Sequence, residues 1–127
     1  MTFPANLLYT PEHEWIRFEA DDTAVVGITD FAQSELGDIV FVDIQTEGQA
    51  LGQQEIFGTV EAVKTVSDLF IPISGTILEV NKELIDSPEL ANTDPYGKGW
   101  MIKMNMQNTN EKAGLLGVEA YKALIGH

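Results

Sequence analysis

Short segments with the composition of β-strands fill the first two thirds of the chain, and this pattern limits the possible folds more than any other feature. They are rich in Val, Ile, Phe and Thr and are separated by Gly, Asp or Pro, which is typical of a sandwich or a small barrel. We therefore predict a mainly β fold. The expected strands span residues 13–18, 23–29, 38–44, 55–63, 65–71 and 76–80.

Helical patterns are short and lie between or after these strands. Asp30 is expected to N-cap a short helix that runs through Ala32, Ser34 and Leu36. Gly37 is expected at the C′ position, directly after the helix, which glycine favours. Two turn clusters break residues 81–98 into an irregular excursion, and a last strand is expected over residues 100–106. Apolar residues recur at helical spacing up to Ile125, which predicts a C-terminal helix.

Length and charge narrow the possible functions. A chain of 127 residues with 44% hydrophobic residues is expected to form one domain, residues 1–127. Seven Lys and Arg against 20 Asp and Glu give a formal charge of −13, which disfavours binding to nucleic acid and to anionic membranes. Such acidity suits docking to basic surfaces, or it simply keeps the protein in solution.

The chain has no cysteine, so any sulfur redox chemistry must be supplied by a cofactor. Its two histidines have no recognisable metal-site spacing, and His13 is interpreted as a satisfied surface residue. The N-terminus lacks the features of a signal peptide, and no apolar run approaches bilayer length. We expect a soluble cytoplasmic protein, or a mitochondrial matrix protein if a transit peptide has been removed.

One lysine lies inside an apolar, β-branched stretch. Lys64 is the only cationic residue between Arg17 and Lys82, and a lysine centred in a buried strand costs several kcal/mol unless it is paired. A hairpin tip would bring its amine to water, although Val63-Lys64 lacks the Asn-Gly or Asp-Gly signature of tight turns. For a lysine considered alone, the solvent face of an edge strand is the alternative.

Glycines on either side of Lys64 favour the hairpin. Gly48 lies sixteen positions before the lysine and Gly75 eleven positions after it, with β segments on both sides. This spacing resembles that of lipoyl domains, in which two similar half-motifs display a lysine at an exposed turn. A protruding primary amine is what a ligase needs to form an amide, and the amide removes the charge.

Biotin carriers share this architecture and are the nearest alternative. They usually flank the acceptor lysine with methionines, whereas Val63 and Thr65 flank Lys64. Lys103 is followed by Met104 and lies near Met101, but its segment alternates regularly and has no glycines at carrier spacing. We interpret Lys103 as an ordinary solvent-facing strand residue.

From Tyr9 to about Ile125, the chain closely resembles the H proteins of the glycine cleavage system. The matching stretches are YTPEHEW, VGITDFAQ, LGDIVFV, VN and DPYGKGW, at residues 9–15, 26–33, 36–42, 80–81 and 94–100. The resemblance implies a small sandwich or barrel-sandwich hybrid of two antiparallel sheets. A lipoyl hairpin, short connecting helices and a C-terminal helix would complete the fold.

The resemblance also implies a non-catalytic carrier with lipoate attached to Lys64 through an amide. The arm would visit glycine decarboxylase, which uses pyridoxal phosphate, a tetrahydrofolate-dependent aminomethyltransferase and the FAD enzyme dihydrolipoyl dehydrogenase. It would receive an aminomethyl group at the first, deliver it at the second and be reoxidised at the third. A lipoate ligase or a lipoyl/octanoyl transferase would attach the lipoyl group.

Residue-by-residue matching to the family places two carboxylates, those of Glu14 and Asp68, in a cleft that shelters the amine of the carried group. Lys64 and Asp68 share strand parity, so we expect both to face one side, roughly 13 Å apart if the strand is extended. Trp15 is expected to be a core or cleft-wall aromatic. Glu35 stands where some members place a histidine near the arm, so that histidine contact is not carried over.

Two alternatives from other functional classes stay open. One is a lipoyl-relay protein that donates lipoyl or octanoyl groups to other lipoate-dependent enzymes. The other is an unrelated acidic enzyme, although the sequence has no HExxH, EF-hand, phosphate-loop or nucleophile-elbow motif.

Overall fold

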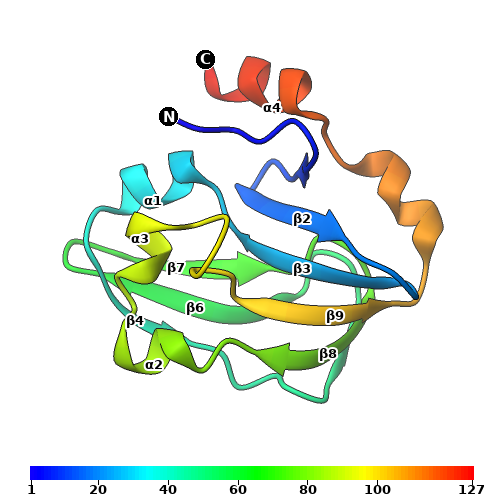
Figure 1. Cartoon of the computed structure of the whole chain (residues 1–127), viewed down its shortest axis with the longest axis horizontal. Coiled ribbons are helices and arrows are strands. Elements are labelled where there is room, and N and C mark those ends of the chain that lie inside the picture. Colours follow the sequence, from blue (N-terminus) through cyan, green and yellow to red (C-terminus); the bar gives the residue numbers. More distant parts are fainter.

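Two antiparallel sheets form the body of the computed structural model, which describes residues 1–127 (Figure 1). The larger sheet has the strand order β1-β2-β3-β9-β8-β5, the smaller has the order β4-β6-β7, and neither closes into a barrel. The strands are β1 (Leu8–Tyr9), β2 (Glu14–Phe18), β3 (Thr23–Ile28), β4 (Ile39–Asp43), β5 (Ala50–Leu51), β6 (Ile56–Ala62), β7 (Val66–Phe70), β8 (Gly75–Val80) and β9 (Ile102–Met106).

All seven strands expected from the sequence are confirmed, each to within two residues at either end. The strands β1 and β5 were not predicted, because two residues are too few to carry an alternating pattern. The helices are α1 (Asp30–Leu36), α2 (Glu83–Asp86), α3 (Leu90–Thr93), α4 (Val118–Ile125) and a 3₁₀ helix at Thr109–Gly114. Thus α2 and α3 lie within the expected irregular excursion, and no helix is long and apolar enough to cross a membrane.

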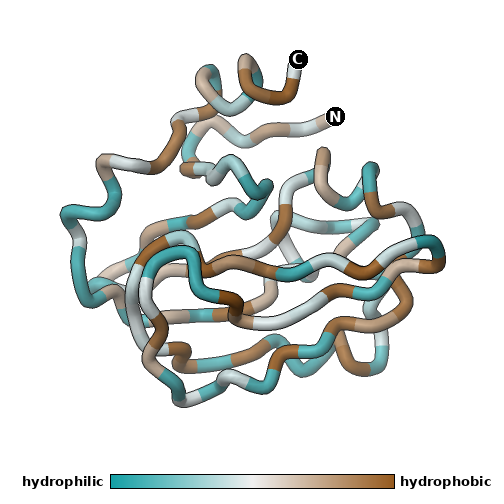
Figure 2. The backbone as a smooth tube through the Cα atoms, turned by 180° about the vertical axis from the view of Figure 1, so that it is seen from behind, coloured by the Kyte–Doolittle hydropathy of each residue, from teal (hydrophilic) through white to brown (hydrophobic).

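The main core lies between the two sheets and contains 19 buried residues. Ile16 of β2, Val60 of β6 and Ile77 of β8 are all fully buried in it, so both sheets contribute to one apolar layer. Figure 2 shows the alternation of hydrophobic and hydrophilic residues along the strands that this layer requires. In β9 the pattern leaves Lys103 exposed between buried neighbours, which confirms that it is an ordinary solvent-facing strand residue.

A second, smaller cluster lies between the larger sheet and α4 and includes Trp15 and Tyr121, both fully buried. The indole N–H of Trp15 donates to the carbonyl of Pro95 at 3.0 Å. Gly27 is its cross-strand partner, and a β-carbon at Gly27 would lie 2.7 Å from the indole ring. Of the two roles expected for Trp15, core residue and cleft wall, the structure therefore selects the core.

The start of α1 differs from the expectation by one residue. Thr29 is the N-cap, since its extended backbone lets the hydroxyl accept a hydrogen bond from the N–H of Ala32 at 3.1 Å. Asp30, the expected cap, is instead the first helical residue, where its carboxylate accepts from the side chain of Gln33. The predicted end at Gly37 is confirmed, with φ of 79°.

Candidate functional site

Lys64 lies at the tip of the hairpin formed by β6 and β7. Glu61 and Val66 are the last paired residues, and Ala62 N–H donates to the carbonyl of Thr65 at 2.8 Å to close the turn. The lysine is exposed and outside both strands, which confirms the predicted hairpin tip and excludes the edge-strand alternative. Its amine is part of no salt bridge, so it is free to react.

Two contacts place this tip beside α1. Val63 N–H donates to the carbonyl of Asp38 at 3.0 Å, which attaches the turn to the segment that follows the helix. The lysine side chain passes Gly37, because a β-carbon there would lie 3.5 Å from Lys64 Cε. An arm attached to Lys64 therefore starts at the C-terminal end of α1.

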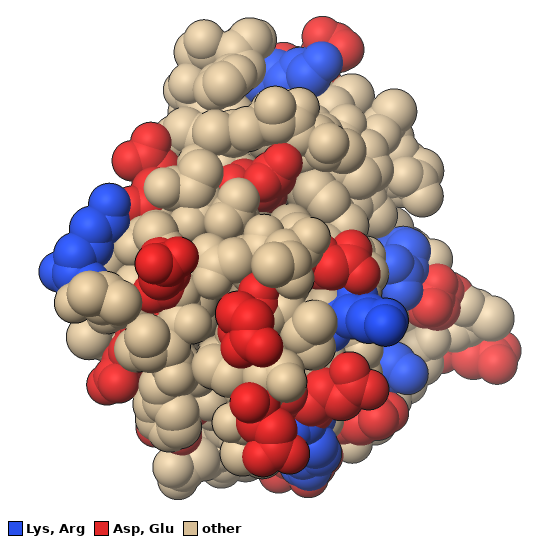
Figure 3. Space-filling view, turned by 60° about the vertical axis from the view of Figure 1, so that its left-hand side comes forward, with Lys and Arg blue, Asp and Glu red and all other residues tan.

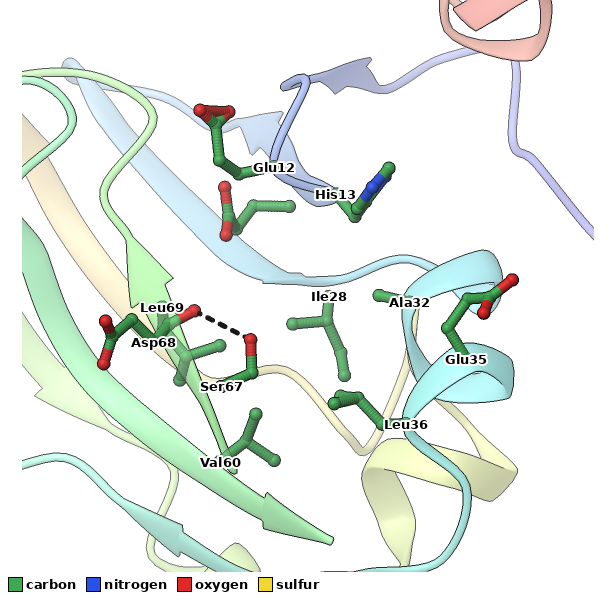
Figure 4. A pocket seen from close by; sticks show the side chains of 11 residues that line it. Glu12, His13, Ile28, Ala32, Glu35, Leu36, Val60, Ser67, Asp68 and Leu69 are labelled. Atoms are coloured by element: carbon green, nitrogen blue, oxygen red, sulfur yellow. Dashed lines mark hydrogen bonds between the residues drawn. The ribbon is translucent and has the colours of Figure 1, made fainter. Parts of the chain in front are cut away.

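A cleft of about 150 Å³ lies between α1, the start of β2 and the strand β7 (Figure 4). We call the group Glu12, His13 and Glu14 its strand wall, and the group Ala32, Glu35 and Leu36 its helix wall. The remaining lining residues come from β3, β6 and β7: Ile28, Val60, Ser67, Asp68 and Leu69. Four carboxyl groups thus surround an apolar floor, on a protein whose acidic side chains outnumber basic ones over the face in Figure 3.

Glu14 is the buried carboxyl of the cleft, with only 2% of its surface exposed. Its oxygens accept hydrogen bonds from the Thr10 hydroxyl at 2.7 Å and from the Phe70 backbone N–H at 3.3 Å, and it forms no salt bridge. Burial raises its pKa to about 8, against the opposing effect of these hydrogen bonds. The chain alone therefore carries Glu14 largely protonated at neutral pH, and a cation in the cleft would favour its ionised form.

Asp68 is at the rim of the cleft, on the opposite face of β7 from Leu69. Its cross-strand neighbour is Thr59, whereas the neighbouring Ser67 pairs with the buried Val60. In Figure 4 the carboxylate of Asp68 points away from the cleft and the hydroxyl of Ser67 points into it. The expected shared parity with Lys64 is wrong, because the lysine belongs to the turn and not to the extended strand.

Ser67 and His13 are cleft residues that the sequence interpretation missed. The alternation in β7, read outward from the buried Leu69, would have placed Ser67 on the inner face. His13 was expected at the surface but is half-buried, with Nδ1 2.9 Å from the Tyr121 hydroxyl. Burial lowers its pKa, while Glu12 and Glu35 act in the opposite direction. No three His, Asp or Glu side chains converge as a metal site would require.

Comparisons with known proteins agree in fold and in sequence. The family model described as "Glycine cleavage H-protein" matches residues 7–127. The glycine cleavage system H protein of Bacteroides fragilis is 58% identical over 125 residues, with 98% of each chain covered. That of Chlorobium luteolum is 61% identical over 127 residues, with 99% of each covered.

Among solved structures, the crystal structure of a glycine cleavage system H protein from Mycobacterium marinum superimposes with a TM-score of 0.87. Its sequence is 38% identical, and the match covers 98% of this chain and all of the other. The similarity therefore includes both sheets, the hairpin and the terminal helix.

Proposed function

Because this chain belongs to the glycine cleavage H-protein family, we propose that Lys64 is the residue on which it carries its covalent lipoyl group. The family consists of lipoyl carriers of the glycine cleavage system, so the chain is a carrier and not an enzyme. It interacts with the other enzymes of that system. We further propose that a lipoate ligase or a lipoyl/octanoyl transferase modifies it.

The surroundings of Lys64 fit this attachment. Its amine is exposed at the end of a well-ordered hairpin, where a modifying enzyme can reach it without unfolding a strand. By contrast, Lys103 lies inside the larger sheet with its amine 3.7 Å from Glu79, and Lys82 is paired with Glu47 at 3.1 Å. Acylation of Lys64 removes its positive charge but breaks no salt bridge. We therefore expect the modification to leave the stability of the fold unchanged.

A lipoyl group held on Lys64 would supply a dithiolane whose sulfur can carry an aminomethyl group and whose dithiol form can be reoxidised by thiol-disulfide exchange. The protein's contribution is to present the arm and to shelter the carried group. Tethering at Lys64 raises the concentration of the arm at a docked active site without any further contact.

We assign the sheltering role to the cleft, and within it chiefly to Glu14. A charge-assisted hydrogen bond between the carried ammonium and the Glu14 carboxylate is worth about 1.5–3 kcal/mol where water is excluded. Ile28, Leu36 and Val60 line the cleft and exclude that water. The amine can expel sulfur only with a free lone pair, so by keeping it protonated Glu14 slows the loss of the group.

Asp68 has a lesser proposed role. Its exposed carboxylate at the rim adds negative potential toward the amine, but solvent screens it far more than it screens Glu14. Glu12 and Glu35 line the edges of the cleft with their carboxylates directed outward, as Figure 4 shows, and add to the same negative potential. The observation that best supports the assignment is a carboxyl group that is 2% exposed, has no salt bridge and lines a cleft beside an exposed lysine.

Lipoylation in vitro tests the attachment site. The purified chain is incubated with lipoic acid, ATP and a lipoate ligase, and its intact mass is measured. We expect one lipoyl addition on the unmodified sequence and on Lys103→Ala, and none on Lys64→Ala. Addition to Lys64→Ala would exclude the site. Reconstitution with the three partner enzymes then separates the carrier from a relay protein, because a dedicated relay protein should not support glycine turnover.

A further inference from the structure

The C-terminal helix α4 reaches the cleft through one side chain, that of Tyr121. This is the only buried residue of the helix. Its ring stacks on Tyr9 with centroids 4.7 Å apart and meets the ring of Phe3 edge-on at 5.8 Å. In Figure 1, α4 lies outside the larger sheet, beyond the N-terminal segment, so Tyr121 is its inward anchor.

The hydroxyl of Tyr121 contacts two residues that border the cleft. It is 2.9 Å from Nδ1 of His13 and 2.8 Å from Oγ1 of Thr29. A phenol has one proton to donate and lone pairs to accept with, so it can satisfy both contacts at once. Burial raises the pKa of Tyr121 to about 12, which keeps the hydroxyl neutral and its proton in place at physiological pH.

These two contacts lead to opposite walls of the cleft. His13 belongs to the strand wall and directly precedes Glu14. Thr29 caps α1, and its Oγ1 also accepts from the N–H of Ala32, the first residue of the helix wall. The Tyr121 hydroxyl is therefore bonded to the strand wall at His13 and to Thr29, the N-cap of the helix that carries the helix wall.

Both walls depend on such external contacts. His13 has φ of 75°, in the left-handed region, which is strained for a non-glycine residue and persists only where its surroundings enforce it. The helix α1 contains no fully buried residue, and only Ala32 and Leu36 pack, partly buried, against the main core. The N-cap at Thr29 and the contacts around it therefore help to fix the position of the helix.

We propose that Tyr121 is a positioning residue for the cleft, whose hydroxyl reinforces the backbone hydrogen bond from Thr29 N–H to the His13 carbonyl (3.0 Å) and so helps to hold the strand wall and the helix wall around Glu14. It acts through His13 and Thr29 and does not touch the carried group. The inference rests on the proposed function of the cleft and extends it to a residue of the C-terminal helix, outside the cleft.

The substitution Tyr121→Phe tests this, because it keeps the ring and removes only the hydroxyl. Tyr9→Phe is the matched control: Tyr9 is equally buried and stacks on Tyr121, but its hydroxyl donates to the carbonyl of Pro4 at 2.6 Å and touches no cleft residue. Each variant is lipoylated and loaded with glycine and glycine decarboxylase. The rate at which the carried group is lost is then measured, with urea unfolding in parallel.

We expect Tyr121→Phe to lose the group about threefold to tenfold faster than the unsubstituted protein, and Tyr9→Phe to stay within about twofold of it. Equal rates in the two variants would overturn the proposal. Faster loss in Glu14→Gln together with an unchanged rate in Tyr121→Phe would reject the positioning role alone. An unchanged rate in Glu14→Gln would instead reject the proposed role of the cleft, and the positioning role with it.

Hydrogen exchange on the unlipoylated protein provides a second readout. The amide of Ala32, bonded to Thr29, should exchange faster in Tyr121→Phe than in Tyr9→Phe, whereas amides of β9 should exchange alike in both. A uniform increase over all amides would indicate a general loss of stability and would reject positioning. Should Tyr121→Phe fail to fold, Thr29→Val and Thr29→Ser are compared by the rate at which the carried group is lost. Thr29→Val removes the contact to Tyr121 together with the helix cap, and Thr29→Ser, which retains a hydroxyl for both, should restore the rate.

Discussion

Glu14 at the start of β2 accepts a hydrogen bond from the backbone N–H of Phe70 at the end of β7, at 3.3 Å. This contact joins the larger sheet to the smaller one beside the cleft. The same carboxyl group is therefore hydrogen-bonded within the fold and also lines the cleft, where it can contact a bound group. Stability and protection of the carried group should therefore respond to Glu14 in opposite directions.

The first prediction concerns the pH dependence of stability in the unlipoylated protein. Burial raises the pKa of Glu14 from 4.5 to about 8, so between these values the folded chain holds a proton that the unfolded chain has lost. The contribution of Glu14 to the free energy of unfolding is fully present below about pH 4.5 and is lost as the pH rises toward about 8, by about 5 kcal/mol in total. Glu14→Gln should remove this slope.

Urea unfolding of both proteins from pH 5 to pH 9 measures the effect. Glu61→Gln is the control, because Glu61 is exposed on β6, forms no salt bridge and should leave the slope intact. We expect Glu14→Gln to be the more stable protein at the alkaline end. Parallel curves for Glu14→Gln and the unsubstituted chain would show that the carboxyl does not titrate as its burial requires.

The second prediction concerns the loaded arm. Glu14→Gln and Asp68→Asn should both accept lipoate normally, since neither residue touches the hairpin tip. Glu14→Gln should lose the carried group about tenfold to a hundredfold faster, the factor that corresponds to a charge-assisted hydrogen bond. Asp68→Asn should accelerate the loss only about twofold, because its carboxylate is exposed and points away from the cleft.

Decay of the loaded protein, followed by intact mass, gives both rates. Unchanged decay in both variants would leave no role for these carboxylates. A larger effect of Asp68→Asn than of Glu14→Gln would mean that the carried amine lies on the outer face of β7 and not in the cleft.

The third prediction concerns Gly37, beside the base of the arm. Its φ of 79° is strained for any residue with a β-carbon, although such a carbon would contact Lys64 Cε without a clash, at 3.5 Å. Gly37→Ala should lower the free energy of unfolding by about 1–3 kcal/mol, because φ of 79° with ψ of −154° is almost exclusive to glycine, and should leave lipoylation intact. Gly117→Ala is the control, since Gly117 has φ of −73° and open space around it. Lost lipoylation in Gly37→Ala would show that the turn had moved.

The fourth prediction concerns the packing of Trp15 on Gly27. A β-carbon at Gly27 would lie 2.7 Å from the indole, in a region where the ring is fully buried and cannot shift freely. Gly27→Ala should therefore destabilise the protein by about 1–3 kcal/mol or more and alter the tryptophan fluorescence. Gly114→Ala, with nothing near its added methyl group, should leave both properties unchanged.

Most of the strands could be predicted from the sequence, because each is a local run of alternating or apolar residues. The segment from Asp38 to Ile44 is an example, and its central residues form β4. The hairpin tip at Lys64 was predictable for a related reason: the cost of burying an unpaired cation in an apolar stretch is set by the local composition. The one-residue error at Asp30 shows the limit, since Thr and Asp are both good caps and only the backbone path distinguishes them.

The sequence by itself determined the seven longer strands, the exposed lysine and, through its matching stretches, the family. Only the tertiary structure decided which side chains form the cleft, because its lining comes from separate segments, the most distant of which, at Glu14 and Ser67, are more than fifty residues apart in the chain. It also buried Glu14, turned Asp68 outward and brought Tyr121 against His13. Burial, pKa and hydrogen-bond partners depend on long-range packing, and no local pattern of residues encodes them.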